Sequence, residues 1–156
     1  MKLITFAGPP SCGKTSVLVH VLRELERAGL SCGVVKFDCL SSNEQERYEA
    51  IGVPFLCGLS LGRCPDHFFA TNLPGCIRWG RGLGLDILFT ESAGLCNRCS
   101  PYLTGIPAVS VIDNLAGMEA PAKIGPMVQH ADIVVVTKGD IVSQAEREVF
   151  AARVGS

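Results

Sequence analysis

The sequence has almost no net charge and no long hydrophobic run. Its 14 lysines and arginines nearly balance 15 aspartates and glutamates, which leaves a formal net charge of −1. Proteins that are held on nucleic acid by charge carry a basic patch or stripe, and this chain has none. A membrane helix needs about 20 consecutive apolar residues, and no stretch reaches that length. We therefore expect no nucleic-acid partner and no membrane attachment.

A secretory signal is also lacking. Residues 1–7 are apolar but too short for the core of a signal peptide, and Lys2 is their only basic residue. We therefore expect a cytoplasmic protein, whose eight cysteines are reduced thiols or metal ligands because disulfides are rare in that compartment. The composition, 47% hydrophobic and 19% charged, is that of a folded globular chain, and 156 residues predict one domain.

The most specific motif spans residues 8–15, which read G-x-x-x-x-G-K-T. An apolar run, residues 3–7, precedes it, and residues 16–28 follow with apolar side chains at helical spacing. A strand, a glycine-rich loop and a helix in this order are typical of a phosphate-binding P-loop, in which several backbone N–H groups face one anion. We expect this segment to bind nucleotide through Gly8, Ser11, Cys12, Gly13, Lys14, Thr15 and Ser16.

Acidic residues at the ends of two predicted strands complete a hydrolytic site. In P-loop hydrolases the loop lysine contacts the β- and γ-phosphates, and the loop threonine and a strand-end carboxylate hold Mg²⁺. Lys14, Thr15 and Glu91 fit these roles, and the N–H of Gly94 would contact the γ-phosphate. Asp38 is either a further carboxylate for Mg²⁺ or water, or a turn residue that ends its strand. The predicted catalytic residues are therefore Lys14, Thr15, Asp38 and Glu91.

The rest of the chain alternates predicted strands and helices. Short apolar runs predict strands at 32–37, 53–57, 85–89, 108–112 and 132–136, and helical patterns lie at 42–50, 66–77 and 143–154. We expect Pro74 and Gly75 to bend or interrupt the second of these helices, and we expect the charged residues of the first to form a solvated face, namely Glu44, Glu46, Arg47 and Glu49. The order predicts an α/β fold, a Rossmann-like P-loop NTPase with a mostly parallel sheet flanked by helices.

A guanine-recognition motif follows the last predicted strand, where Thr137, Lys138, Gly139 and Asp140 read T-K-G-D. A carboxylate can accept two hydrogen bonds, from the N1–H and the exocyclic amine of guanine, and adenine offers no such pair of donors. A buried carboxylate left without them would disfavour ATP. We therefore expect GTP as the nucleotide, bound through Thr137, Lys138 and Asp140.

Two cysteine-containing segments are candidates for a second metal site. Cys64 and His67 are three residues apart, which suits two ligands of one soft-to-borderline divalent metal such as Zn²⁺ or Ni²⁺. Cys96 and Cys99 form a C-x-x-C just after the Glu91 segment, which suits a dithiolate site or a redox pair. Alternatively these thiols are small core residues. We interpret the following cysteines as structural: Cys12, Cys32, Cys39 and Cys57.

Over nearly its whole length the chain resembles the HypB/UreG/CobW family of metallochaperone GTPases. The resemblance is carried by residues 8–15, 35–38, 86–94 and 131–140. It implies a Rossmann-like P-loop GTPase whose GTP-bound form is a homodimer and handles a metal at the dimer interface. It also implies delivery of that metal to a client metalloenzyme or accessory protein.

Both cysteine segments have counterparts in this family. Cys64-Pro65-Asp66-His67 is similar to the Cys-Pro-His motif of the urease-type members, with one inserted aspartate, and Cys99-Ser100-Pro101 stands where hydrogenase-type members have Cys-Pro. Family members continue into another strand and a loop that supports the base, whereas this sequence ends at Ser156, inside or just after a predicted helix. We therefore expect residues 1–156 to be one domain that stops before its last strand.

These features favour a slow GTPase that acts as a switch, because no arginine finger is evident. One alternative is an electron-transfer ATPase with an iron–sulfur cluster bridged by the C-x-x-C of two subunits. A second is a small-molecule kinase with arginine phosphate clamps, for which the sequence offers Arg63, Arg78 and Arg81. A third is a non-catalytic module that stores or senses metal.

Overall fold

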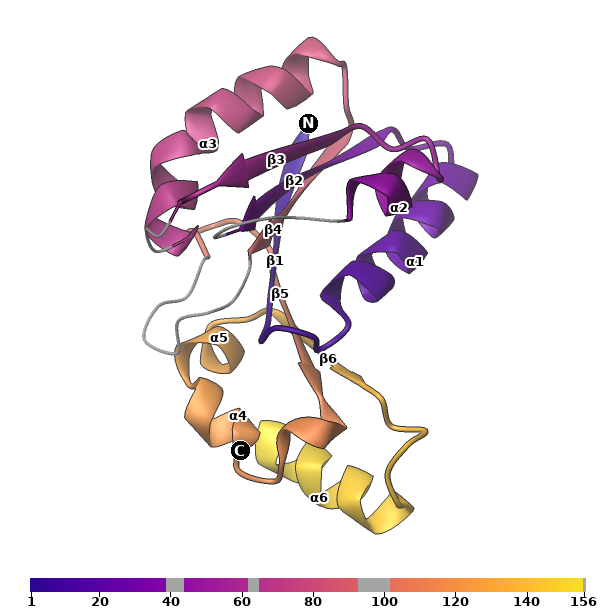
Figure 1. Cartoon of the computed structure of the whole chain (residues 1–156), viewed down its shortest axis with the longest axis vertical. Helices are drawn as coiled ribbons and strands as arrows, with labels where there is room; N and C mark the ends of the chain where they lie inside the picture. The colour runs from indigo at the N-terminus through magenta and orange to yellow at the C-terminus, as the bar shows by residue number, and fades with distance from the viewer. Residues whose placement is uncertain (39–43, 62–64, 93–101, 156) are drawn as a thin grey trace.

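The computed structural model describes residues 1–38, 44–61, 65–92 and 102–155 (Figure 1). The elements in chain order are β1 (Lys2–Ala7), α1 (Lys14–Arg27), β2 (Cys32–Asp38), α2 (Gln45–Glu49), β3 (Phe55–Leu59), α3 (Pro65–Gly82), β4 (Ile87–Ser92), β5 (Ala108–Asp113), a 3-10 helix (Asn114–Ala116), α4 (Ala120–Ile124), α5 (Pro126–Gln129), β6 (Ile133–Thr137) and α6 (Gln144–Val154). The predicted strands and helices are present, whereas the three short helices between β5 and β6 were not predicted. Within the described ranges no helix is both long and apolar enough to cross a membrane.

The six strands form one parallel sheet in the order β3-β2-β4-β1-β5-β6. This order confirms the predicted α/β fold with a parallel sheet. The strand that leads into the P-loop, β1, lies between β4 and β5 in the middle of the sheet. In register, Lys36 of β2 pairs with Glu91 of β4, and Asp113 of β5 pairs with Thr137 of β6. Because all strands run the same way, these residues lie at one edge of the sheet, on either side of the P-loop.

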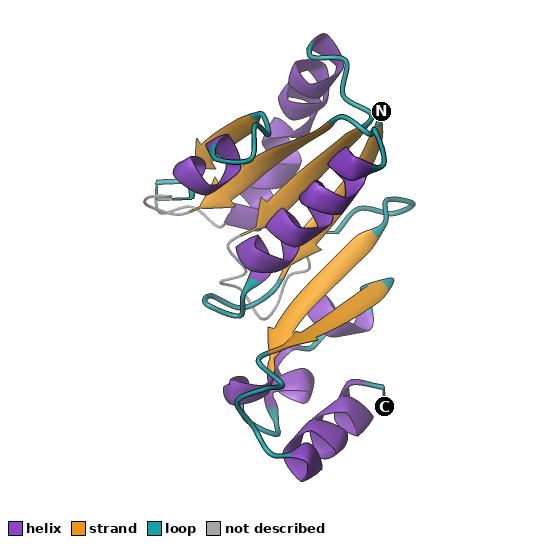
Figure 2. Cartoon of the chain, turned by 90° about the vertical axis from the view of Figure 1, so that its right-hand side faces the viewer, coloured by secondary structure: helices purple, strands orange, loops and turns teal. Residues whose placement is uncertain are grey.

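Helices cover both faces of the sheet, as Figures 1 and 2 show. On one face, α1 and α2 pack Leu18, Leu22 and Tyr48 against alternate residues of the strands, such as Phe89. On the opposite face, α3 packs against one half of the sheet, while α4, α5 and α6 pack against β5 around Ile112. Successive strand residues point to opposite faces, so the near-continuous apolar runs in the sequence supply both layers of the core.

The helix α3 runs without interruption through Pro74, so of the two predicted effects of Pro74 and Gly75, a bend or an interruption, the interruption is wrong. A proline inside a helix removes one backbone hydrogen bond and costs about 3 kcal/mol. The apolar face of α3, with Phe69 and Cys76 buried against β2 and β4, offsets this cost, because burying a large apolar side chain contributes about 1.5–3 kcal/mol. Tertiary packing therefore overrides the local preference at Pro74.

Candidate functional site

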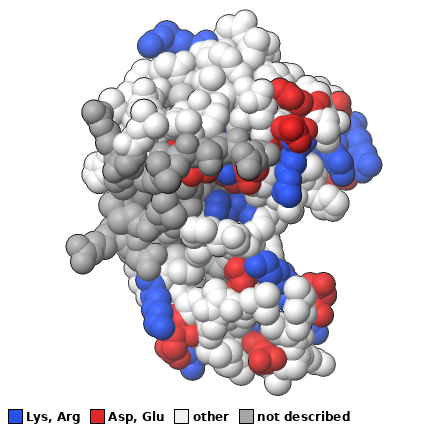
Figure 3. All heavy atoms as spheres, viewed as in Figure 1, with Lys and Arg blue, Asp and Glu red and all other residues white. Residues whose placement is uncertain are grey.

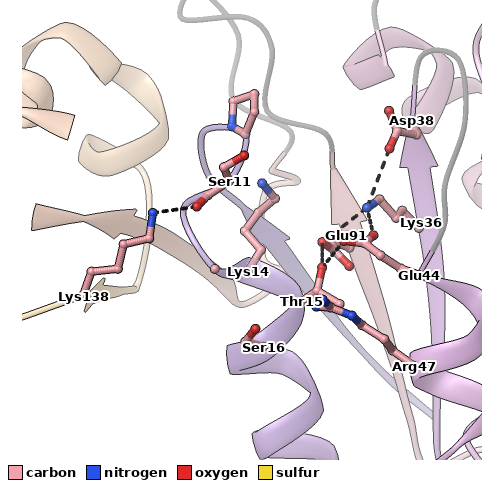
Figure 4. Close-up of a pocket in the computed structure, with 12 residues that line it drawn as sticks. Ser11, Lys14, Thr15, Ser16, Lys36, Asp38, Glu44, Arg47, Glu91 and Lys138 are labelled. Atoms are coloured by element: carbon pink, nitrogen blue, oxygen red, sulfur yellow. Dashed lines mark hydrogen bonds and ion pairs between the residues drawn. The ribbon is translucent and has the colours of Figure 1, made fainter. Parts of the chain in front are cut away.

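A polar pocket of about 490 Å³ lies at the carboxyl ends of the central strands. On the face shown in Figure 3, acidic and basic side chains gather in a hollow near the middle of the molecule. The pocket is lined by the P-loop, the ends of β2 and β4, the start of α2 and the segment after β6, through Pro10, Ser11, Gly13, Lys14, Thr15, Ser16, Lys36, Asp38, Glu44, Arg47, Glu91 and Lys138. Segments far apart in the sequence therefore form one site (Figure 4).

The P-loop owes its tight curl to glycine. Gly8 has a φ of 154°, and a Cβ atom at this position would lie 2.0 Å from the carbonyl oxygen of Val111, so no other residue fits there. Gly13, with a φ of 92°, precedes the first turn of α1. The thiol of Cys12 donates a hydrogen bond of 3.0 Å to the Val111 carbonyl oxygen, and burial raises its pKa. The Cys12 side chain therefore anchors the loop on β5, and Cys12, predicted to contact the nucleotide, is fully buried and does not line the pocket.

Lys14 lies inside this loop. Its Nζ donates hydrogen bonds to the carbonyl oxygens of Gly8 and Pro9, at 2.9 Å and 2.8 Å. Burial lowers the pKa of Lys14, because desolvation disfavours the ammonium form. The loop carbonyls offset part of this penalty and hold the amino group at the pocket (Figure 4).

The Thr15 hydroxyl lies between two carboxylates. Its Oγ1 is 2.6 Å from Oε1 of Glu44 and 2.9 Å from Oε1 of Glu91. A hydroxyl carries one hydrogen and can donate it to only one of these oxygens at a time. A hydroxyl and two carboxylates that converge in this way are the hard oxygen ligands that Mg²⁺ prefers. This donor set therefore fits a magnesium ion.

Glu91 is the most enclosed of the acidic residues in the pocket, with 1% of its surface exposed. Besides the contact with Thr15, its Oε2 accepts a hydrogen bond of 2.7 Å from the hydroxyl of Tyr48, which is itself fully buried. Burial and the negative charge of Glu91 raise the pKa of Tyr48, so the phenol stays a donor. Tyr48 thereby holds Glu91 in a fixed orientation toward the P-loop.

Three charged residues of the pocket were missed by sequence reasoning as parts of a site. Glu44 and Arg47 both line the pocket. Of the residues predicted on a solvated face, Arg47, Glu46 and Glu49 are exposed, whereas Glu44 is only partly exposed and contacts Thr15. The prediction is wrong for Glu44 because a tertiary contact, which no helical periodicity reveals, turns its side chain toward α1. Lys36 is buried and forms an ion pair with Glu44. In the sequence, the only indication that Lys36 belongs to a site is its position within a mostly apolar predicted strand.

The predicted guanine-recognition segment lies against the P-loop. The hydroxyl of Thr137 donates a hydrogen bond of 2.6 Å to the carbonyl oxygen of Cys12. Lys138, in a left-handed conformation with a φ of 56°, donates one of 2.8 Å to the carbonyl oxygen of Ser11. Its Nζ is also 3.3 Å from Oδ2 of Asp113 at the end of β5. Asp140 is exposed two residues further on.

The predicted transition-metal ligands fall mostly outside the described residues. Cys64, Cys96 and Cys99 are not described, while His67 is exposed in the first turn of α3. Gly94, predicted to contact the γ-phosphate, also lies outside the described residues. In the described part of the chain, no three His, Cys, Asp or Glu side chains are grouped so as to hold a metal ion. Of the cysteines interpreted as structural, Cys12 and Cys32 are buried and Cys57 is partly buried, while Cys39 is not described.

Comparison with known proteins relates the whole chain to one family. The model of the CobW/HypB/UreG nucleotide-binding domain matches residues 2–156. An uncharacterized protein of Methanocaldococcus jannaschii is 50% identical over 154 residues, which make up 99% of this chain and 66% of that protein. The urease accessory protein UreG of Mycolicibacterium gilvum is 29% identical over 150 residues, which make up 90% of this chain and 72% of UreG. The chain thus spans about two thirds of the length of the first of these relatives.

Solved structures of hydrogenase maturation factors share the fold. HypB from Archaeoglobus fulgidus superposes with a TM-score of 0.74 at 17% identity, over 99% of this chain and 75% of that one. HypB from Helicobacter pylori in complex with nickel gives a TM-score of 0.74 at 22% identity, over 99% and 71% of the two chains. These likenesses confirm the Rossmann-like P-loop fold.

The bond between Tyr48 and Glu91 gives a first prediction. In Tyr48→Phe the buried carboxylate loses a donor, and leaving such a group unsatisfied costs about 1–3 kcal/mol. We expect the free energy of unfolding in urea to fall by that amount. Tyr102→Phe is the matched control, because its hydroxyl donates to a neutral acceptor, the carbonyl oxygen of Met127, at 2.9 Å. Equal losses in the two variants would contradict a special role for the bond to Glu91.

Proposed function

Because the chain belongs to the CobW/HypB/UreG family, we propose that it binds and hydrolyses GTP with Mg²⁺ and that this cycle controls the binding and delivery of a transition metal. One observation carries the proposal: Lys14 and Thr15 of the P-loop share a pocket with the strand-end Glu91. These are the residue types that P-loop hydrolases use on a triphosphate and its metal ion.

Lys14 and the backbone of the P-loop would hold the phosphates. In the described part of the chain the Lys14 ammonium donates to neutral carbonyl oxygens of its own loop, and phosphate oxygens would attract it more strongly because they carry a negative charge. The loop precedes the first turn of α1, whose N-terminal N–H groups also favour an anion. Ser11, Gly13 and Ser16 line the same pocket and would border the phosphates.

Thr15, Glu91 and Glu44 would hold Mg²⁺, and Asp38 lines the same pocket. When bound, the ion would neutralise charge on the phosphates. The side chains of this chain supply positioning: Tyr48 fixes Glu91, and Glu91 fixes the Thr15 hydroxyl. A water molecule oriented by a strand-end carboxylate, Asp38 or Glu91, would be the nucleophile. Positioning and charge stabilisation without a dedicated base fit a slow switch.

Guanine would be recognised by the segment after β6. Thr137 and Lys138 are bonded to the P-loop, so a nucleotide whose phosphates lie on that loop would extend its base toward this segment. Asp140 would then accept hydrogen bonds from the guanine edge. Because Asp140 is exposed, a ligand can reach its carboxylate from solvent.

The transition metal would be bound by the cysteine segments. In sequence, Cys96 and Cys99 come after β4, which carries Glu91, and Cys64 comes just before α3, which carries His67. Glu91, which lines the nucleotide pocket, therefore precedes the C-x-x-C by a few residues in the chain, so a change at Glu91 could alter the position of the two cysteines. We propose Ni²⁺ or Zn²⁺ as the cargo, a homodimer that forms with GTP, and delivery to a client metalloenzyme or accessory protein.

Replacing the P-loop lysine tests the phosphate site. In Lys14→Ala the affinity for GTP should fall at least about tenfold, because a hydrogen bond to a charged group is worth about 1.5–3 kcal/mol. Hydrolysis should fall about 100-fold or more, since the charge that develops on the phosphates loses its partner. Fluorescent nucleotide titration and phosphate release measure the two effects. Lys123→Ala, an exposed lysine on α4, is the control. Unchanged binding and hydrolysis in Lys14→Ala would refute the proposal.

Replacing Asp140 tests the choice of base. Asp140→Ala should lower the affinity for GTP about tenfold or more and leave that for ATP unchanged, because only guanine donates two hydrogen bonds to the carboxylate. Competition of each nucleotide against a fluorescent GDP analogue measures both affinities on the same protein, so ATP serves as the internal control. Equal losses of affinity for GTP and ATP would show that Asp140 does not select the base and that its replacement disturbs the protein in general.

The cargo site is tested by a metal titration of the reduced protein. Ni²⁺ and Zn²⁺ are added to protein loaded with GDP or with a non-hydrolysable GTP analogue, and mass is read by light scattering. We expect tighter metal binding and a dimer with the GTP analogue, and loss of both in Cys96→Ala/Cys99→Ala. Cys57→Ala, a partly buried thiol of β3, is the control. Metal binding that is the same in both nucleotide states and in the double variant would contradict a nucleotide-controlled cargo site.

A further inference from the structure

Lys36 is a buried cation in the nucleotide pocket, and the proposed reaction assigns it no role. It lies near the end of β2 and exposes 6% of its surface. The two other lysines of the pocket, Lys14 and Lys138, have amino groups that donate to carbonyl oxygens of the P-loop. Lys138 also pairs with Asp113, which does not line the pocket, whereas Lys36 faces acidic side chains that do, so its charge acts on the proposed magnesium ligands.

Three carboxylates surround the Lys36 ammonium. Its Nζ is 3.6 Å from Oδ2 of Asp38 and 3.8 Å from Oε1 of Glu91, and it forms an ion pair with Oε2 of Glu44. Figure 4 shows the amino group beside these side chains, with Thr15 on the opposite side of Glu44 and Glu91. The acidic residues come from β2, from β4 and from the residue before α2. One ammonium therefore connects the three segments that would surround the metal ion.

The same two glutamates face Lys36 and the Thr15 hydroxyl. Glu44 presents one oxygen to each, and Oε1 of Glu91 lies 2.9 Å from Thr15 Oγ1 and 3.8 Å from Lys36 Nζ. A divalent ion bound by Thr15, Glu44 and Glu91 would therefore have a fixed positive charge as its neighbour. Like charges this close repel each other strongly where water is largely excluded.

We propose that Lys36 is a built-in counter-cation that makes the binding of Mg²⁺ depend on the binding of a triphosphate. Without nucleotide, Lys36 already neutralises part of the charge of Asp38, Glu44 and Glu91, so a divalent ion gains little there. Phosphate groups add negative charge to the pocket. This charge attracts the Lys36 ammonium and makes the binding of a divalent metal ion favourable as well. Coupling of this kind is reciprocal, so the metal ion also strengthens nucleotide binding. The inference rests on the proposed nucleotide site.

The charge of Lys36 can be removed with little change of shape in Lys36→Met. We expect this substitution to change the affinities for the metal ion and for the nucleotide in opposite directions. Without nucleotide, the carboxylates lose their counter-cation, so Mn²⁺, used as a paramagnetic probe for Mg²⁺, should bind at least about tenfold more tightly. Without metal, in excess chelator, a fluorescent GTP analogue should bind at least about tenfold more weakly, because the phosphates lose a positive partner. Electron paramagnetic resonance measures free Mn²⁺, and fluorescence measures the nucleotide.

Two further variants separate charge from general damage. Lys36→Met/Glu44→Gln removes one charge of each sign, and its Mn²⁺ affinity should return toward that of the wild type. Lys123→Met removes a distant exposed lysine and should leave both affinities unchanged. Parallel losses of both affinities in Lys36→Met, or no change in either, would overturn the inference.

The Mn²⁺ titration contains no nucleotide, so the experiments distinguish failure of the proposed function from failure of the proposed role of Lys36. A wild-type protein that binds no GTP refutes the proposed function, whatever Mn²⁺ does. A wild-type protein that binds GTP, together with Lys36→Met that binds Mn²⁺ no more tightly, refutes only the role of Lys36. Circular dichroism and urea unfolding of each variant verify that the affinities are those of folded protein.

Discussion

The contact of the Thr15 hydroxyl with Glu44 and Glu91 is the interaction on which the rest of the pocket depends. It joins the start of α1, the residue before α2 and the carboxyl end of β4 at a single oxygen atom. One hydroxyl proton cannot satisfy two carboxylates, so the neighbouring side chains provide the missing positive charge and hydrogen bonds. Lys36 supplies the charge and Tyr48 the second bond to Glu91.

The parallel sheet makes this contact possible. With β1 flanked by β4 and β5, the P-loop leaves the middle of the sheet and the strands on both sides end beside it. One side contributes the carboxylates and Lys36, while the other contributes Thr137 and Lys138, which bind the loop backbone. The phosphate-binding loop is thus held between a charged cluster and the segment proposed to recognise the base. A nucleotide that fills the pocket would contact both.

Much of this site could be predicted from the sequence, because glycine spacing and strand ends determine local backbone geometry. The P-loop and the strand before Glu91 follow from short-range patterns. Glu44 could not be found in this way, since its approach to Thr15 is a tertiary contact and its neighbours suggest only an exposed helix. For Lys36 the sequence indicates an unusual buried charge but not its partners. Likewise, the continuity of α3 through Pro74 depends on packing against the sheet, which local propensity does not include.

The central claim is that the P-loop, Glu44 and Glu91 act as one nucleotide-responsive unit. Hydrogen–deuterium exchange of the wild-type protein tests it most directly, with GDP or with a non-hydrolysable GTP analogue, each in Mg²⁺. The account predicts that the GTP analogue slows exchange in the P-loop and, in the same step, in residues 44–52, which include Glu44 and α2. Slower exchange in the P-loop alone, with residues 44–52 the same in both nucleotide states, would contradict it.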